Sequence, residues 1–183
     1  MDIGSEFYKR YLDGDEEGMN GLIREYSDGL TFYLTTFVRD FDTAEDLMLD
    51  TFVKLGTKKP RDNGKGTFKT WLYAIGRNLA LDYLRKHKND PVPDENVEFT
   101  ADLEDPLRTY LKSERNEVLY RSLRKINADY ARGLWLQYFE GLKTEEIAKV
   151  IHRTVHATES MLTRARKSLG EELKKEGFTY EDL

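Results

Sequence analysis

The segment from Thr67 to Lys86, TFKTWLYAIGRNLALDYLRK, combines large aromatic side chains with cations in a pattern of helical period. Flat aromatic faces can stack on exposed bases, and each stacked base contributes about 1–3 kcal/mol with little dependence on sequence. Cations beside them can hold phosphates, and an amide can both donate to and accept from a base edge. With the basic loop before it, the segment offers these candidates for binding a single strand: Arg61, Asn63, Lys65, Lys69, Trp71, Tyr73, Arg77, Asn78 and Arg85.

The same segment also fits an ordinary amphipathic helix whose apolar side chains fill the core and whose cations are solvated. The distribution of charge along the chain helps to distinguish this interpretation from binding of a nucleic acid. The whole chain of 183 residues carries a net charge of −5, which by itself argues against nucleic acid. However, residues 58–88 hold nine Lys or Arg and two Asp or Glu, a local charge of +7, whereas residues 1–57 carry −8. This local positive charge favours a nucleic-acid partner for the aromatic segment.

Composition excludes several other kinds of chemistry. Cysteine is absent, so the chain has no thiol nucleophile, disulfide or thiolate zinc site, which agrees with a reducing cytoplasm. No apolar run approaches the roughly 18 residues of a membrane span, and no leader peptide is recognisable. No cofactor is predicted. Residues 1–7, MDIGSEF, are interpreted as a cloning scar and left out of the fold, because two common restriction sites encode Gly-Ser-Glu-Phe.

Every periodic stretch of the chain is helical, which predicts an all-α fold. Apolar residues recur at spacings of three and four between Leu22 and Phe41. Asp42 is then expected to cap a second helix, with Glu45 as its capping-box partner. Thr67 is expected to cap a third helix that runs to about His87.

Residues 89–115 separate two predicted helical domains. Their first part holds three prolines, seven acids and no basic residue, and no helical period runs through it, so we interpret residues 89–115 as an acidic flexible linker. The predicted domains are therefore residues 8–88 and 116–183.

The second domain shows a short helix beginning at Thr144, a tight turn and a longer basic helix, which is the helix-turn-helix pattern. In that motif the second helix enters the major groove of DNA. The residues expected to face DNA there are Arg153, Thr158, Glu159, Ser160, Thr163, Arg164, Arg166 and Lys167.

A metal site in the same region is disfavoured. His152, His156 and Glu159 could share one helix face, but Arg153 stands where the H-E-x-x-H pattern requires its Glu. Surface histidines are the favoured interpretation, and no metal ligands are predicted.

Five segments resemble the extracytoplasmic-function (ECF) sigma factors, the small two-domain initiation factors of bacteria, and they agree with that family in order and spacing. YLDGDEEGMNGLIREY resembles the opening helix of the family. FKTWLYAIGRNLALDYLRK resembles their promoter-melting region, and FDTAEDLMLDTFVKL the helix that docks on the RNA polymerase clamp. INADYARGLWLQYFEGLKTEEIAKVI and ESMLTRARKSL resemble the beginning and the closing helix of their second domain. The resemblance covers about residues 8 to 175.

The resemblance implies a bacterial transcription initiation factor that is not an enzyme. Residues 8–88 would bind core RNA polymerase and melt and read the −10 element, with Asn78 in a pocket for a flipped base, and residues 116–183 would contact the −35 element. An anti-sigma factor is a further expected partner. The family's clamp-docking surface corresponds to Glu45, Asp46, Leu49, Asp50 and Phe52.

The recognition helix departs from the family pattern. Where the family usually has a basic residue, Ser and Arg, this chain has Glu159, Ser160 and Met161. A glutamate accepts a hydrogen bond from cytosine N4 and repels phosphate. Weak or unusual −35 recognition is therefore expected, with more of the specificity in the first domain. Asp62, in a loop where relatives can carry an aromatic, leaves the identity of the captured base open.

Other interpretations stay open. A sigma-like decoy that sequesters an anti-sigma factor without reading promoters would explain the altered recognition helix, although it would need no base pocket. A free-standing helix-turn-helix repressor would leave the first domain unexplained. A metal hydrolase is the most remote interpretation.

Overall fold

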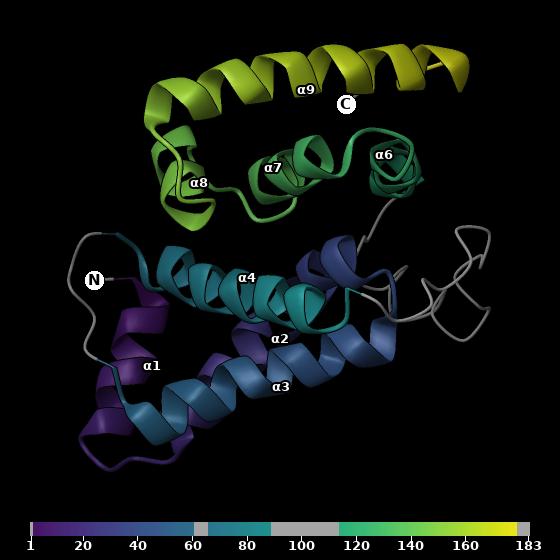
Figure 1. The fold of residues 1–183 in the computed structure, drawn as a ribbon. Helices are drawn as coiled ribbons and strands as arrows, with labels where there is room; N and C mark the ends of the chain where they lie inside the picture. The colour runs from purple at the N-terminus through teal and green to yellow at the C-terminus, as the bar shows by residue number, and fades with distance from the viewer. Residues whose placement is uncertain (1, 61–65, 89–113, 179–183) are drawn as a thin grey trace. The chain divides into compact units, whose positions relative to one another are not determined.

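The computed structural model describes residues 2–60, 66–88 and 114–178, and every regular element in these ranges is an α-helix (Figure 1). In chain order the helices are α1 (Ile3–Leu12), α2 (Glu17–Val38), α3 (Phe41–Lys58), α4 (Phe68–Lys86), α6 (Glu114–Leu123), α7 (Ala128–Tyr138), α8 (Thr144–Val150) and α9 (Val155–Lys175). The predicted all-α fold is confirmed, and it divides into two compact units. The predicted linker lies almost wholly outside the described residues. None of the described helices is long and apolar enough to cross a membrane.

The first unit is built around α2, against which α1, α3 and α4 pack. Leu22, Leu30 and Leu34 of α2 are completely buried, as are Leu55 of α3 and Leu72 of α4. Burying a side chain of this size contributes about 1.5–3 kcal/mol relative to leaving it exposed. The apolar period that predicts the helices therefore also forms the core that holds them together.

The chain turns between α2 and α3 in only two residues. Arg39 takes a left-handed conformation with φ 55° and donates its N–H to the carbonyl of Thr35, which ends α2. Asp40 then caps α3 by accepting a hydrogen bond from the N–H of Thr43 at 2.8 Å. The prediction that Asp42 caps this helix is wrong, because Asp42 already lies in its first turn. Thr67 caps α4 as predicted, by accepting from the N–H of Thr70 at 3.2 Å.

Residues 2–7 are part of the fold. Asp2 caps α1, and the helix itself begins at Ile3. Gly4 is buried where α1 crosses α4, and a Cβ at this position would lie 2.4 Å from Cδ1 of Phe68. The expectation that residues 1–7 lie outside the fold is therefore wrong for residues 2–7, whereas their origin as a cloning scar stays a prediction.

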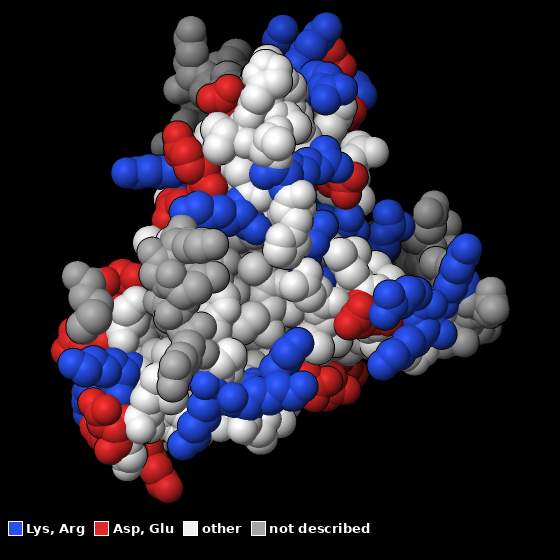
Figure 2. Space-filling model, turned by 60° about the vertical axis from the view of Figure 1, so that its left-hand side comes forward, with Lys and Arg blue, Asp and Glu red and all other residues white. Residues whose placement is uncertain are grey.

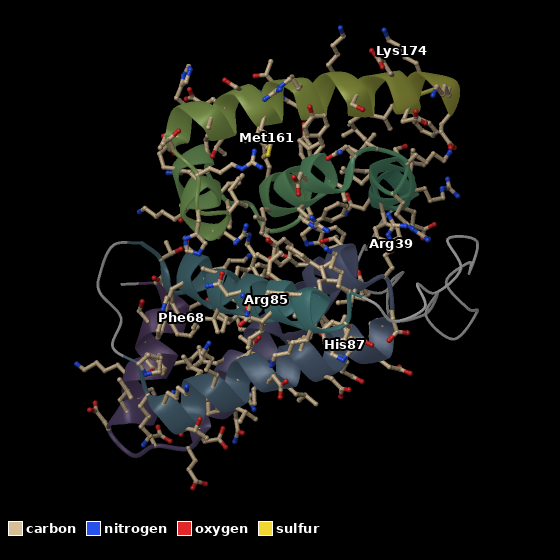
Figure 3. The ribbon with its side chains drawn as sticks, in the orientation of Figure 1. Arg39, Phe68, Arg85, His87, Met161 and Lys174 are labelled. Atoms are coloured by element: carbon tan, nitrogen blue, oxygen red, sulfur yellow. The ribbon has the colours of Figure 1, made fainter. Side chains whose placement is uncertain are left out.

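The second unit contains α6, α7, α9 and the beginning of α8. Its core is centred on Trp135 of α7, which stacks on Phe139 with ring centroids 4.3 Å apart. Gly133 lets α9 approach α7, since a Cβ there would lie 2.6 Å from the terminal methyl of Met161. Figure 3 shows the Met161 side chain pointing from α9 toward α7.

The helix-turn-helix prediction is confirmed. The short helix α8 is followed by a turn in which His152 has a left-handed φ of 54°, and Thr154 then caps α9 by accepting from the N–H of Ala157. This turn fixes where the long helix α9 begins.

Candidate nucleic-acid interface

Three predicted DNA-binding residues of α4 lie on one stripe of that helix. Trp71, Asn78 and Arg85 follow one another at intervals of seven residues, which place them about 10.5 Å apart along the axis and nearly in line. Trp71 is half-buried, whereas Asn78 and Arg85 are exposed. Arg77 and Lys69 flank the stripe with partial exposure. The stripe thus offers an aromatic ring, an amide and cations along about 21 Å of helix.

The polar groups of this stripe have few ties to the rest of the unit. Among the described residues, the Asn78 side chain has no hydrogen-bond partner within the chain. Arg85 pairs with Asp82 at 3.0 Å, but both side chains are more than half exposed, so this surface pair contributes little. Both residues therefore remain available for an incoming strand.

Tyr73 does not belong to this surface. It is completely buried, and its ring lies 5.4 Å from that of Tyr33 in α2. The prediction that it presents a face for base stacking is therefore wrong for this structure. The reason is that α4 packs against both α2 and α3, which buries a wider arc of the helix than a single apolar stripe.

Trp71 contacts two aromatic neighbours. Its ring centroid lies 5.4 Å from that of Tyr8 in α1 and 5.6 Å from that of Phe68, both in edge-to-face geometry. Figure 3 shows Phe68 and Arg85 toward opposite ends of α4. The remaining predicted residues of this site, Arg61, Asn63 and Lys65, lie outside the described residues.

The exposed face of α3 carries the predicted polymerase-docking residues, with one exception and one addition. Glu45, Asp46 and Asp50 are exposed, and Leu49 is 50% exposed. Phe52 is 5% exposed and belongs to the core, so its assignment to the docking surface is wrong. Sequence reasoning missed Val53, which is 58% exposed and lies one turn after Leu49. Its i, i+4 spacing from Leu49, outside the apolar stripe that faces the core, is the signal that points to it.

In α9 the outward face and the core face are clearly separated. The exposed residues expected to meet DNA are Glu159, Ser160, Thr163, Arg164 and Lys167, and Arg153 is exposed in the turn before them. Arg166 is half-buried and donates to Gln137 at 3.3 Å, which ties α9 to α7.

Thr158, a predicted DNA contact, and Met161 both lie in α9 and belong to the core. Thr158 is completely buried and donates its hydroxyl to the carbonyl of Thr154 at 2.9 Å, so its assignment to the DNA surface is wrong. Met161 is 2% exposed and packs on Gly133. Glu159, by contrast, is exposed and places a negative charge on the outward face of α9.

The face drawn in Figure 2 carries charge of both signs. Groups of Lys and Arg side chains lie there next to groups of Asp and Glu side chains. Sequence-independent affinity for DNA scales with the number of phosphates neutralised, so a mixed surface gives weak binding by the protein alone. Within the described part of the chain, no group of three or more His, Cys, Asp or Glu side chains could hold a metal ion.

Comparison with protein families shows which proteins combine these two units. Residues 22–89 match the family model described as sigma-70 region 2, and residues 116–169 match the one described as sigma-70 region 4. The first match spans most of α2 and all of α3 and α4, and the second spans α7, α8 and most of α6 and α9.

Curated relatives match along most of their length. The RNA polymerase sigma-H factor of Pseudomonas aeruginosa is 28% identical over 179 residues, covering 92% of this chain and 93% of the relative. The ECF RNA polymerase sigma-E factor of Haemophilus influenzae is 27% identical, covering 88% and 90%. The chain belongs to the ECF family of RNA polymerase sigma factors, and it is thus a factor that directs the polymerase to promoters.

Solved structures show the same fold. CnrH in complex with the cytosolic domain of CnrY aligns with a TM-score of 0.68 at 21% identity, covering 95% of this chain and 99% of that chain. The sigma factor RpoE of Bartonella quintana, in complex with the anti-sigma factor NepR, aligns with a TM-score of 0.59 at 21% identity, covering 83% and 94%.

Proposed function

We propose that this sigma factor opens and reads the −10 element mainly with the α4 stripe of Trp71, Asn78 and Arg85. The observation that carries the proposal is the exposure of Asn78 between an aromatic ring and a cation, with no hydrogen bond to the described part of its own chain. An amide in this position can bond a base edge while the ring stacks and the cation holds phosphate. Removing a base from the stack costs a few kcal/mol, which such contacts offset.

The proposed docking site for core RNA polymerase is the outward face of α3. Leu49 and Val53 form a small exposed apolar pair bordered by Glu45, Asp46 and Asp50. Such a combination suits a protein partner, since acidic side chains repel the phosphates of DNA. This placement also explains why a factor that binds promoters carries −8 in its first 57 residues.

The second unit is proposed to contact the −35 element through α9, with reduced affinity. The exposed side chains that can bind the phosphate backbone of DNA are Arg153, Ser160, Thr163, Arg164 and Lys167. Glu159 repels phosphate and favours a cytosine base. We further propose that the protein works in the cytoplasm and makes no covalent change itself. We also propose that it binds an anti-sigma factor, as the name of the Bartonella quintana complex states for RpoE.

The test is in vitro transcription with purified bacterial core polymerase on a promoter library. Wild type is compared with Asn78→Ala and Glu159→Ala. Asn20→Ala on α2 is the matched control for loss of an exposed amide, and Glu171→Ala controls for loss of an exposed carboxylate farther along α9.

Asn78→Ala is expected to lose or change the −10 preference, while Glu159→Ala leaves it unchanged and relaxes a −35 preference for cytosine. The two control variants should behave as wild type. If wild type binds core polymerase but starts no transcript from any promoter, the reading function is refuted and a decoy that captures an anti-sigma factor takes its place.

A further inference from the structure

Helix α1 precedes the part of the chain that matches the family model, which begins at residue 22, yet it packs against the helix that carries the DNA-binding stripe. Gly4, Tyr8 and Tyr11 are spaced by four and three residues and therefore share one face of α1. Gly4 brings this face so close to α4 that no side chain could be added there, because a Cβ would meet Phe68 at 2.4 Å.

Tyr8 makes the central contacts of this face. Its hydroxyl donates to the carbonyl of Pro60 at 2.7 Å, beyond the end of α3. Its ring lies 5.5 Å from Phe68 and 5.4 Å from Trp71, both on α4. The side chain is only 3% exposed. One residue of α1 thus contacts both the end of the α3 segment and the first turn of α4.

We infer that Tyr8 is a positioning residue that sets the orientation of the Trp71 indole for an opened DNA strand. The inference rests on the proposed function of α4. A half-buried indole that neighbouring rings already restrain has fewer orientations to lose when a base stacks on it, so pre-organisation increases affinity. The edge-to-face contacts with Tyr8 and Phe68 supply that restraint, and the hydrogen bond to Pro60 fixes the Tyr8 ring itself.

A tyrosine that only fills the core would show the same burial, so the test needs a readout specific to Trp71. Tyr11 provides the matched control. It lies on the same helix, and its hydroxyl donates to the carbonyl of Gly56 at 3.0 Å, within α3 and away from α4. Tyr8→Phe and Tyr11→Phe therefore each remove one hydroxyl and one hydrogen bond, but only Tyr8 contacts Trp71.

The first arm uses the full-length free protein labelled with 5-fluorotryptophan, followed by fluorine NMR. The chain has two tryptophans, and Trp71→Phe assigns the resonance. We expect the Trp71 resonance to shift and broaden in Tyr8→Phe, to do so more strongly in Tyr8→Leu, and to stay unchanged in Tyr11→Phe. An unchanged Trp71 resonance in Tyr8→Leu overturns the inference without any reference to DNA.

The second arm measures the affinity of the factor bound to core polymerase for a single-stranded −10 oligonucleotide. Tyr8→Leu should weaken this affinity about 3–10-fold, the size of one aromatic contact. In a Trp71→Ala background the same substitution should change it less than twofold, because the residue to be positioned is gone.

The outcomes separate the two proposals. Equal effects of Tyr8→Leu with and without Trp71 would indicate general destabilisation and overturn the inference. A wild-type complex that binds no −10 strand would refute the proposed function and with it the DNA part of the inference, while the NMR arm would still decide whether Tyr8 orients Trp71.

Discussion

Replacing Asp2 by alanine removes a carboxylate that accepts hydrogen bonds from two helices of the first unit. The N–H and hydroxyl of Ser5 in α1 each donate to it at 3.0 Å, and the N–H of Phe68 in α4 donates at 3.1 Å. Loss of an N-cap costs about 1 kcal/mol, and loss of a hydrogen bond to a charged group about 1.5–3 kcal/mol. Because the carboxylate is only partly buried, we expect Asp2→Ala to lower the free energy of unfolding of this unit by about 2–3 kcal/mol.

The dependence of this effect on pH gives a second check. Burial opposes ionisation of Asp2, but the hydrogen bonds from Ser5 and Phe68 outweigh it, so the pKa of Asp2 lies below its usual value of 3.8. A group whose pKa is lowered by folding stabilises the folded state above its unfolded pKa, and this stabilisation is lost as the pH falls through the folded pKa. The difference between wild type and Asp2→Ala should therefore be constant near neutral pH and shrink below about pH 4.

The assay is urea unfolding followed through the fluorine resonance of Trp71, which reports on the first unit alone. Asp2→Asn is the matched variant, since asparagine also caps helices but carries no charge, and it should cost less than alanine and show no such change at acid pH. A free energy of unfolding for Asp2→Ala within 0.5 kcal/mol of wild type, roughly the ordinary scatter of surface substitutions, would show that Asp2 does not join α1 to α4.

Three further predictions concern other parts of the molecule. Replacing Leu49 and Val53 together by serine should weaken binding to core polymerase about tenfold in a direct binding assay, while thermal unfolding stays unchanged because both side chains are at least half exposed. A large loss of stability would contradict that assignment. Burial, assisted by the charges of Asp2 and Glu25, raises the pKa of Tyr26 to about 12, so stability should fall between pH 10 and 12 and Tyr26→Phe should reduce that fall in alkaline unfolding experiments. Thr158→Val should leave the affinity for −35 DNA within twofold of wild type, since the Thr158 side chain is completely buried. A larger change of affinity in a binding titration would show that Thr158 contacts DNA.

The helices and several of their ends were predictable because local chemistry determines them. The period of apolar residues identifies α2 to α4, and Thr67 could be recognised as a cap because its hydroxyl suits that role in any context. The start of α3 could not be chosen between Asp40 and Asp42 from residue type alone. The choice depends on Arg39, whose left-handed φ of 55° ends α2 and leaves Asp40 extended, and a side chain in that conformation is not expected from sequence.

The division of site residues into exposed and buried was less predictable. Periodicity gives the direction of an apolar face, but the width of the buried arc depends on how many helices pack against it. Tyr73 and Thr158 are completely buried, and Phe52 is 5% exposed. The role of Tyr8 could not be predicted for another reason. Its partners Pro60 and Trp71 are more than 50 residues away in the sequence, and only the fold brings them together.

The distribution of charge explains how an acidic protein can act at promoters. Phosphate neutralisation gives DNA affinity without specificity, and a chain with a net charge of −5 supplies little of it on its own. Glu159 on the outward face of α9 reduces it further in the unit that would otherwise bind duplex DNA. Stacking and amide contacts along α4 act only on a strand that has already been opened, and they depend less on salt than phosphate contacts do. If the proposed function of α4 holds, such a factor gains most of its promoter affinity after melting, in the complex with polymerase. Its selectivity then depends on which −10 elements open and fit the α4 stripe rather than on how tightly the free protein binds DNA.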